Sequence, residues 1–297
     1  MKIGIVGFDT SHSYVFPQKL RALAETDPRY AALEFPLGWP GDPATAVHPE
    51  ILEGTRKEMD ALGVRPVDSL DALVRECDGF LLENVNGDTH LEAAGHLLPS
   101  GKPVFIDKPL ANTYADALAI QALAEQHGTP VWTASSLRFE PNLLDALERS
   151  VDIQGIDAYG PAPYFEKGRG IVYYGIHTAE MIFSAMGPGI ETVQTLWHED
   201  GEIVAGRWKD GRMAVLRGGR KRVNAFGGVI HGEQSIAFSA TGDFYAAMAR
   251  RLGDFFLDGT CPVPMAESVE VIGFLDAAVC SREAGGRPIG VREALEQ

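Results

Sequence analysis

Short apolar runs alternate with amphipathic stretches through the first 135 residues. The apolar runs are KIGIVGF, AALEFPLGW, GFLLENV, PVFID and PVWTASS. Runs of this length are typical of strands buried on both faces, whereas an apolar residue every three or four positions is typical of a helix. The order strand, helix, strand, helix therefore predicts an α/β domain built on a doubly wound parallel sheet.

The pattern changes after residue 135. Strand-like runs separated by short turns cover residues 152–159, 191–199, 202–209, 212–218, 222–232 and 234–240. A helix is expected near 174–187, and helices at 244–259 and 266–286 close the chain. These features predict an α+β domain with an open, mainly antiparallel sheet. We expect two domains, 1–135 and 136–297, with a cleft between them because no Gly/Ser-rich or Pro-rich linker separates them.

Charge, hydrophobic pattern and cysteine spacing indicate which kinds of partner the protein is not expected to bind. A formal net charge of -15 argues against a nucleic-acid partner, whose phosphates attract basic surfaces. The sequence has no unbroken apolar window of membrane-spanning length and no signal-peptide pattern at its start, so we expect a cytoplasmic protein with no membrane partner. Cys77, Cys261 and Cys280 are widely spaced, so neither a disulfide framework nor a cysteine metal motif is expected. The basic stretch 217–222 is interpreted as a solvated hairpin rather than an anion site.

The stretch GIVGFDTSH, residues 4–12, begins like a dinucleotide-binding loop. The fingerprint G-x-G-x-x-G needs glycine for a tight turn, for close approach of the pyrophosphate and for helix packing. Gly7 occupies the first position, but Asp9 and His12 occupy the other two. A single glycine after a first strand occurs in many doubly wound folds, so this stretch alone leaves nucleotide binding open.

Two later segments resemble one family. The segment GKPVFIDKPLANTYADALAIQALAEQHGTPVWTASSLRFEP resembles the GKHVLxEKPLAxTxxEAxxL and RFxP motifs of the glucose-fructose oxidoreductase, inositol dehydrogenase and MocA (Gfo/Idh/MocA) family. The segment GRGIVYYGIHTAEMIFSAMG is similar to that family's GGxxxDxGxHxxDxxxxxxG helix, with Gly175, His177, Glu180 and Gly187 in register. The resemblance implies a Rossmann domain that binds NAD or NADP and a C-terminal sheet that forms the substrate site. It also implies sugar, cyclitol or polyol substrates and a homodimer or homotetramer.

The resemblance assigns the reaction centre. Lys108, in DKP where the family has EKP, would orient the reacting hydroxyl and stabilise its developing negative charge, and His177 would act as general acid or base. These roles suit hydride transfer, because the hydroxyl proton must leave as the carbonyl forms. The alternatives are a turn lysine on the surface at Lys108 and a hydrogen-bonded structural histidine at His177.

The sequence departs from the family at several functional positions. Tyr173 replaces the aspartate four residues before His177, and either it or Tyr174 would be a hydroxyl relay or one of an aromatic pair packed on the sheet. The segment LGWPGDP has no acid directly at the end of the second strand, and the family's PNxxH turn becomes NGDTH, which keeps His90. The predicted site residues are Lys108, Tyr173 and His177 for catalysis; Gly7, Asp9, Ser11, His12, Asn86, His90 and Lys108 for the cofactor; and Ser135, Arg138 and Tyr174 for the substrate.

These departures set the expectations for binding and function. NAD or NADP binding should survive but be weaker than with a complete fingerprint, because side chains of residues 9–11 are expected to cap the first helix in place of pyrophosphate. We expect a cis Lys108-Pro109 bond and a cleft shared by Lys108 and His177. The alternative functions are a non-catalytic sensor of a carbohydrate or nucleotide, and a hydrolysis or elimination that uses a tightly held nicotinamide.

Overall fold

The computed structural model describes residues 1–296. The chain folds into two compact units. The first unit contains residues 1–111, 116–134 and 245–265, and the second contains residues 112–115, 135–244 and the C-terminal residues from 266 onwards. The stretch 245–265 therefore belongs to the first unit, although it follows the second sheet in the sequence.

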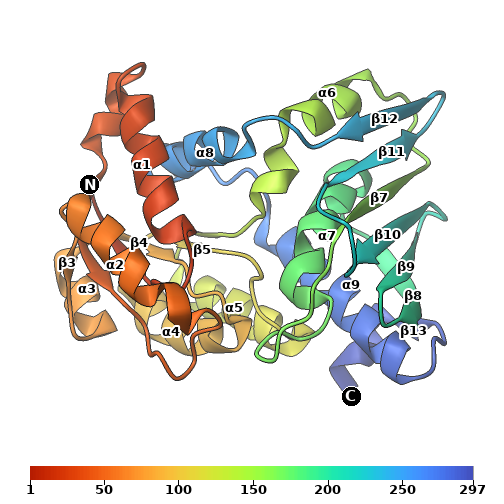
Figure 1. The fold of residues 1–297 in the computed structure, drawn as a ribbon, viewed down its shortest axis with the longest axis horizontal. Coiled ribbons are helices and arrows are strands. Elements are labelled where there is room, and N and C mark those ends of the chain that lie inside the picture. Colours follow the sequence, from red (N-terminus) through yellow and green to blue (C-terminus); the bar gives the residue numbers. More distant parts are fainter. Residues whose placement is uncertain (297) are drawn as a thin grey trace. The chain divides into compact units, whose positions relative to one another are not determined.

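A six-stranded parallel sheet forms the centre of the first unit (Figure 1). Its strands are β1 (Lys2–Val6), β2 (Glu34–Trp39), β3 (Arg65–Pro66), β4 (Gly79–Leu82), β5 (Val104–Ile106) and β6 (Val131–Trp132). The spatial order is β3-β2-β1-β4-β5-β6, and every neighbouring pair is parallel. This confirms the predicted doubly wound sheet. The strand order switches direction between β1 and β4, because β2 and β3 lie on one side of β1 and β4, β5 and β6 on the other. Doubly wound sheets bind ligands at the carboxyl edge of this switch point.

Helices connect these strands and cover the sheet. They are α1 (His12–Ala24), η1 (Pro28–Ala32), η2 (Pro49–Ile51), α2 (Leu52–Ala61), α3 (Leu70–Glu76), η3 (Gly87–Thr89), α4 (His90–Leu97), η4 (Leu98–Ser100), α5 (Tyr114–His127) and α8 (Phe244–Asp258). The strands β4 and β5 are buried along their whole length, as their continuous apolar runs predict. Trp132 of β6 packs between Phe105 of β5 and Phe255 of α8, so α8 completes the core of this unit.

A seven-stranded sheet forms the second unit. Its strands are β7 (Gly155–Pro161), β8 (Ile190–His198), β9 (Gly201–Trp208), β10 (Met213–Gly219), β11 (Gly227–His231), β12 (Ser235–Ser239) and β13 (Ile289–Gly290). The order is β12-β11-β7-β10-β9-β8-β13, and the pairing is antiparallel except between β7 and β10. The hairpin interpretation of residues 217–222 is wrong, because β10 and β11 both pair with β7 and not with each other.

Helices lie along one face of this second sheet (Figure 1). The unit's helices are η5 (Ser136–Phe139), α6 (Pro141–Arg149), α7 (Val172–Met186), α9 (Met265–Glu283) and η6 (Val291–Glu296). α7 contacts β7 and β10, and in α9 the Ala278 carbonyl accepts a hydrogen bond from Thr195 of β8. Leu196, Trp197 and Met213 remain exposed on the sheet. Association through this sheet stays a prediction.

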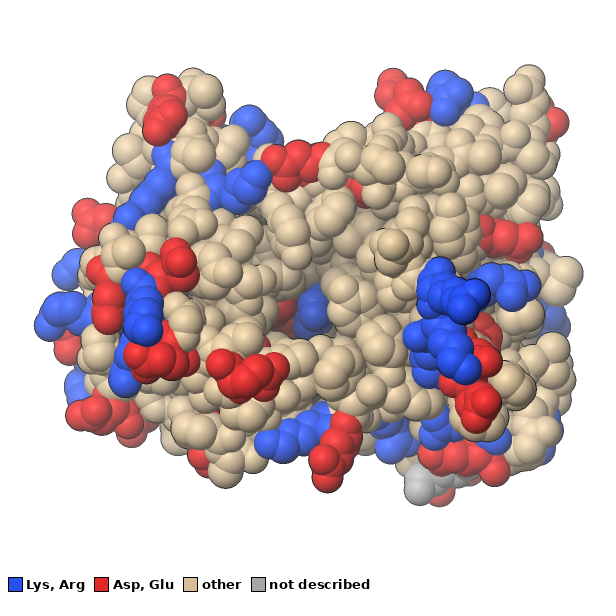
Figure 2. Space-filling view, viewed as in Figure 1, with Lys and Arg blue, Asp and Glu red and all other residues tan. Residues whose placement is uncertain are grey.

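Acidic and basic side chains are mixed over the visible surface, with one group of basic side chains over the second unit (Figure 2). In the 217–222 stretch, Arg220 pairs with Glu202 at 2.7 Å and Lys221 pairs with Asp200 at 2.7 Å. Arg220 and Lys221 are thus paired with carboxylates of the same unit. No helix within residues 1–296 is both long and apolar enough to cross a bilayer.

Candidate functional site

The turn after β1 forms the centre of the carboxyl edge of the first sheet. Gly7 has a φ of 90°, and its N–H donates to the Trp39 carbonyl at the end of β2. A Cβ on Gly7 would lie 2.6 Å from the backbone nitrogen of Asn84, which follows β4. Only glycine suits this conformation and this close approach. The first fingerprint position therefore keeps its structural role.

Asp9, at the second fingerprint position, holds neighbouring loops together. It is 2% exposed, and its carboxylate accepts hydrogen bonds from the Val47 N–H at 3.0 Å and the Val85 N–H at 3.3 Å. The expected side-chain capping of α1 by residues 9–11 is confirmed for Thr10 and wrong for Asp9 and Ser11. Ser11 is the N-cap residue but makes no side-chain capping bond among residues 1–296; the Thr10 hydroxyl accepts from the His12 N–H instead.

His12, at the third fingerprint position, is a buried member of a hydrogen-bonded chain. Its Nδ1 lies 2.7 Å from Oδ2 of Asp107, and its Nε2 lies 3.3 Å from the hydroxyl of Tyr245. Its ring also packs against Phe16 of α1. Burial alone would raise the pKa of Asp107, but the charge and hydrogen bond of His12, with Lys108, hold that pKa below its ordinary value. Asp107 is therefore a carboxylate at neutral pH.

Glu83 follows β4 and is completely buried beside this chain. Within residues 1–296, neither of its carboxyl oxygens has a hydrogen-bond partner. Burial, followed by the charge of Asp107, raises the pKa of Glu83 well above its ordinary value, while Lys108 acts in the opposite direction. Two neighbouring carboxyl groups with opposite shifts share one negative charge between them. Burial therefore favours the protonated form of Glu83, whereas His12 and Lys108 favour the ionised form of Asp107.

Glu83→Gln should become more stable than the wild type as the pH rises. The raised pKa means that folded Glu83 keeps a proton that the unfolded chain releases above pH 4.5. The wild type therefore loses stability from that pH up to the folded-state pKa, by as much as about 1.4 kcal/mol per pH unit, and the amide variant does not. Urea unfolding of both proteins between pH 5 and 8 measures the difference. A large destabilisation that is the same at every pH would show that Glu83 is ionised in the folded state.

Lys108 follows Asp107 and is 8% exposed. The Lys108-Pro109 bond is cis, as predicted. Its positive charge favours the ionised form of both Glu83 and Asp107. The alternative of a surface turn lysine does not describe this buried side chain, although its catalytic role stays a prediction.

The remaining predicted cofactor residues, Asn86 and His90, brace the loop after β4. The Asn86 side chain donates to the Thr45 carbonyl and accepts from the Asp88 N–H. The ring nitrogens of His90 lie 2.6 Å from the Asn84 carbonyl oxygen and 3.2 Å from the Leu110 carbonyl oxygen. Contact of either residue with a nucleotide stays a prediction.

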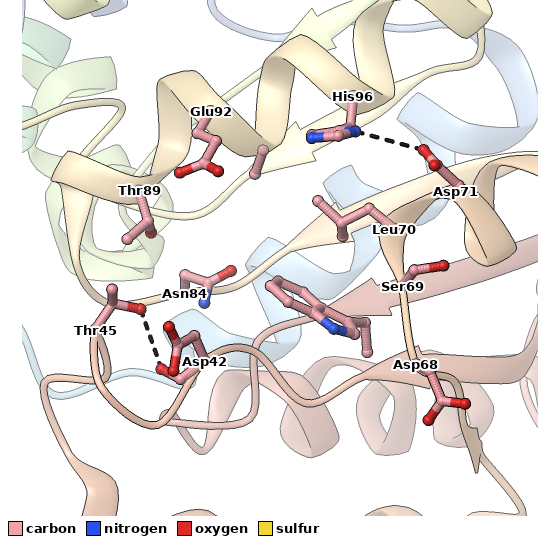
Figure 3. A pocket seen from close by; sticks show the side chains of 12 residues that line it. Asp42, Thr45, Asp68, Ser69, Leu70, Asp71, Asn84, Thr89, Glu92 and His96 are labelled. Atoms are coloured by element: carbon pink, nitrogen blue, oxygen red, sulfur yellow. Dashed lines mark hydrogen bonds and ion pairs between the residues drawn. The ribbon is translucent and has the colours of Figure 1, made fainter.

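A cavity of about 350 Å³ lies at the carboxyl ends of β2, β3 and β4 (Figure 3). Trp39 and Asn84 line it, together with a group of acidic side chains contributed by four segments: Asp42, Asp68, Asp71 and Glu92. Among the described residues that line it there is no lysine or arginine. Asp42 lies three residues after Trp39, the last residue of the second strand, and lines this cavity.

In the second unit, His177 lies on α7 in an aromatic environment. Its Nδ1 lies 2.6 Å from the Ser135 hydroxyl, and the Tyr174 ring meets it edge-on at 4.8 Å between ring centroids. Tyr173 packs against Phe165 with 4.5 Å between centroids. Burial raises the pKa of Tyr174. This packing matches the aromatic-pair alternative, and the hydroxyl relay through either tyrosine stays a prediction.

Arg138 forms a buried ion-pair triad within the second unit. Its Nη1 donates to Glu180 at 2.7 Å, and its Nη2 donates to Glu267. Burial raises the pKa of Glu180 despite the opposing charge of Arg138. These contacts give Arg138 a structural role, while its proposed contact with substrate, like that of Ser135, stays a prediction.

Comparisons with known proteins agree with this architecture. Residues 1–135 match the family model described as "Oxidoreductase family, NAD-binding Rossmann fold". A myo-inositol dehydrogenase, Hyg17 from Streptomyces leeuwenhoekii, is 32% identical over 81 residues, which are 27% of this chain and 25% of that protein. The chain thus matches about a quarter of that relative's length.

Solved structures extend the likeness in fold to nearly the whole chain. GenD2 from gentamicin A biosynthesis, solved in complex with NAD, has a TM-score of 0.80 at 16% identity, covering 98% of this chain and 96% of GenD2. Scyllo-inositol dehydrogenase from Lactobacillus casei, solved with NAD(H) and scyllo-inositol, has a TM-score of 0.79 at 17% identity, covering 98% and 99%. Residues 1–135 thus match the NAD-binding domain of the Gfo/Idh/MocA oxidoreductase family that the sequence resembles, and the whole chain shares the fold of these solved structures.

Proposed function

We propose that this chain is an NAD-dependent oxidoreductase that transfers hydride between nicotinamide and a CH–OH group of a sugar, cyclitol or related polyol. The match of residues 1–135 to the NAD-binding oxidoreductase family carries the proposal. The relatives whose names include inositol dehydrogenase support the substrate class.

The residues of the first unit fit a dinucleotide. The glycine turn at Gly7 brings the backbone close to Asn84 at the point where the strand order reverses. Beside it, the cavity offers an indole surface from Trp39 and carboxylates suited to ribose hydroxyls. When bound, the nicotinamide supplies the hydride acceptor. Lys108 would stabilise negative charge on the reacting oxygen, and the family resemblance assigns the exchange of its proton to His177.

The lining of the cavity favours NAD over NADP. The additional phosphate of NADP would meet Asp42, Asp68, Asp71 and Glu92, and no described lysine or arginine in the lining would neutralise it. Calorimetry should therefore give at least about tenfold tighter binding of NAD(H) than of NADP(H), a difference of about 1.4 kcal/mol. Equal affinities would show that the ribose lies elsewhere.

Turnover tests the reaction itself. Absorbance at 340 nm is followed with each nicotinamide and a panel of sugars, inositols and their keto forms. Lys108→Met should lower the rate of any active combination by about 10²-fold or more, because it removes a positively charged group that stabilises the transition state. The proposal would be overturned if no combination of nicotinamide and substrate changed the absorbance at 340 nm and no nucleotide bound to the protein.

The second candidate is a non-catalytic sensor of a carbohydrate or nucleotide. It is favoured by the replacement of the family's aspartate by Tyr173, which packs in an aromatic cluster. Tight ligand binding without turnover, unchanged in Lys108→Met, would support it.

A further inference from the structure

The hydrogen-bonded chain through His12 has the organisation of a proton-transfer system. Asp107 follows β5, His12 begins α1 and Tyr245 lies on α8, so three separate elements of the first unit position the three groups. His12 and Asp107 are 8% and 2% exposed, and Tyr245 is half-buried. The series of hydrogen bonds therefore leads from a buried carboxylate through an imidazole to a partly accessible phenol.

The carboxylate determines how the imidazole works. The Asp107 carboxylate, 2.7 Å from Nδ1, favours the tautomer of His12 that carries its proton on Nδ1. Nε2 then has a lone pair directed towards the Tyr245 hydroxyl at 3.3 Å. If His12 accepts a second proton, Asp107 stabilises the imidazolium. Nδ1 of His177, by comparison, lies 2.6 Å from the hydroxyl of Ser135.

The strand order places Asp107, which is hydrogen-bonded to His12, on the opposite side of β4 from the cavity. The cavity lies at the ends of β2, β3 and β4, whereas Asp107 lies at the end of β5, on the other side of β4. In a doubly wound sheet a dinucleotide spans the switch point, with one half on each side of it. An adenosine in the cavity would therefore direct the nicotinamide half towards β5.

We propose that Tyr245, His12 and Asp107, in place of His177, form a proton-transfer triad that removes the hydroxyl proton of the alcohol during its oxidation. This inference rests on the proposed oxidoreductase function. As the C–H bond breaks and hydride passes to nicotinamide, the O–H bond of the alcohol breaks and its proton passes to the Tyr245 oxygen. The phenol proton moves to Nε2 of His12, which becomes imidazolium beside Asp107. Tyr245 is the catalytic residue, and His12 and Asp107 are positioning residues.

A bound metal ion is the competing explanation of the same cluster. One ligand atom from each of His12, Glu83 and Asp107 lies within 4.8 Å of the others, and these residue types bind divalent transition metals. The Lys108 charge argues against a metal, because it acts on both carboxyl groups and already offsets the Asp107 carboxylate. A divalent ion there would add positive charge to a site that already contains an ammonium group.

The first test determines the tautomer of His12 and does not depend on enzyme turnover. NMR of protein with ¹⁵N-labelled histidine, with the His12 signals assigned through His12→Gln, should show the Nδ1–H form in the wild type. Asp107→Asn should shift His12 towards the Nε2–H form, because the amide can donate to Nδ1. The wild-type protein is also titrated with Zn²⁺ and Mn²⁺. The triad would be overturned if His12 of the wild type carried its proton on Nε2. Stoichiometric metal binding that Glu83→Gln abolishes would also overturn it.

The second test reads turnover. Tyr245→Phe should lower kcat by about 10²-fold or more and remove the dependence of kcat on pH near neutrality. Tyr14→Phe, on α1, is the matched control and should retain the wild-type rate. Unchanged kcat in Tyr245→Phe would overturn the triad while leaving the proposed function intact. Absence of turnover in the wild type would overturn the proposed function, and the triad's role with it.

Discussion

Gly7→Ala is expected to lower the free energy of unfolding by about 3–5 kcal/mol. The residue has a φ of 90°, which side chains rarely tolerate, and the new Cβ would lie 2.6 Å from the Asn84 nitrogen and 2.9 Å from the Asn84 Cα. Both are backbone atoms that follow the buried strand β4, so a rotamer change cannot relieve the contact. Separation of the two loops would also change the site proposed for the pyrophosphate.

Urea unfolding followed by circular dichroism measures the loss, and Gly95→Ala is the matched control. Gly95 is exposed on α4, and a Cβ there would meet nothing within 4 Å. The control should match the wild type or be more stable by up to about 1 kcal/mol, because alanine favours a helix. A Gly7→Ala protein within about 1 kcal/mol of the wild type would show that the loops separate easily.

The fold of each unit was largely predictable, because periodicity is a local property of the sequence. The apolar runs of the first 135 residues correspond to parallel strands, and the helix expected at 174–187 is α7, Val172–Met186. Strand pairing depends instead on contacts between distant segments. The stretch at 217–222 has the composition of a hairpin turn, yet β7 lies between the strands on either side of it.

The site was less predictable for the same reason. His12 and Asp107 are 95 positions apart. The motifs therefore place His12 in the cofactor loop and Asp107 in the altered EKP segment, but they do not show that the two residues form a hydrogen bond. Glu83 was missed because it lies within the mainly apolar run GFLLENV. A usable signal existed: Glu83 and Asp107 each follow a buried strand, and the carboxyl ends of neighbouring parallel strands meet at one edge. Asp42 was missed because it lies three residues beyond its strand.

Arg138→Met is expected to lower the free energy of unfolding by about 3–5 kcal/mol. The substitution leaves Glu180, 2% exposed, without the guanidinium that accompanies its burial. Glu267 loses the same partner. Adding Glu180→Gln should recover part of the loss, because the amide carries no charge that needs a partner.

Arg149→Met is the matched control in the same unit. Arg149 pairs with Asp145 on α6 at 2.8 Å, but both side chains are exposed, so the substitution should change stability by less than about 1 kcal/mol. Urea unfolding of the three variants and the wild type separates a structural role from a binding role for Arg138. A buried triad predicts a large loss that Glu180→Gln partly reverses. A loss below about 1 kcal/mol, together with weaker polyol binding, would instead make Arg138 the substrate contact that the sequence predicts.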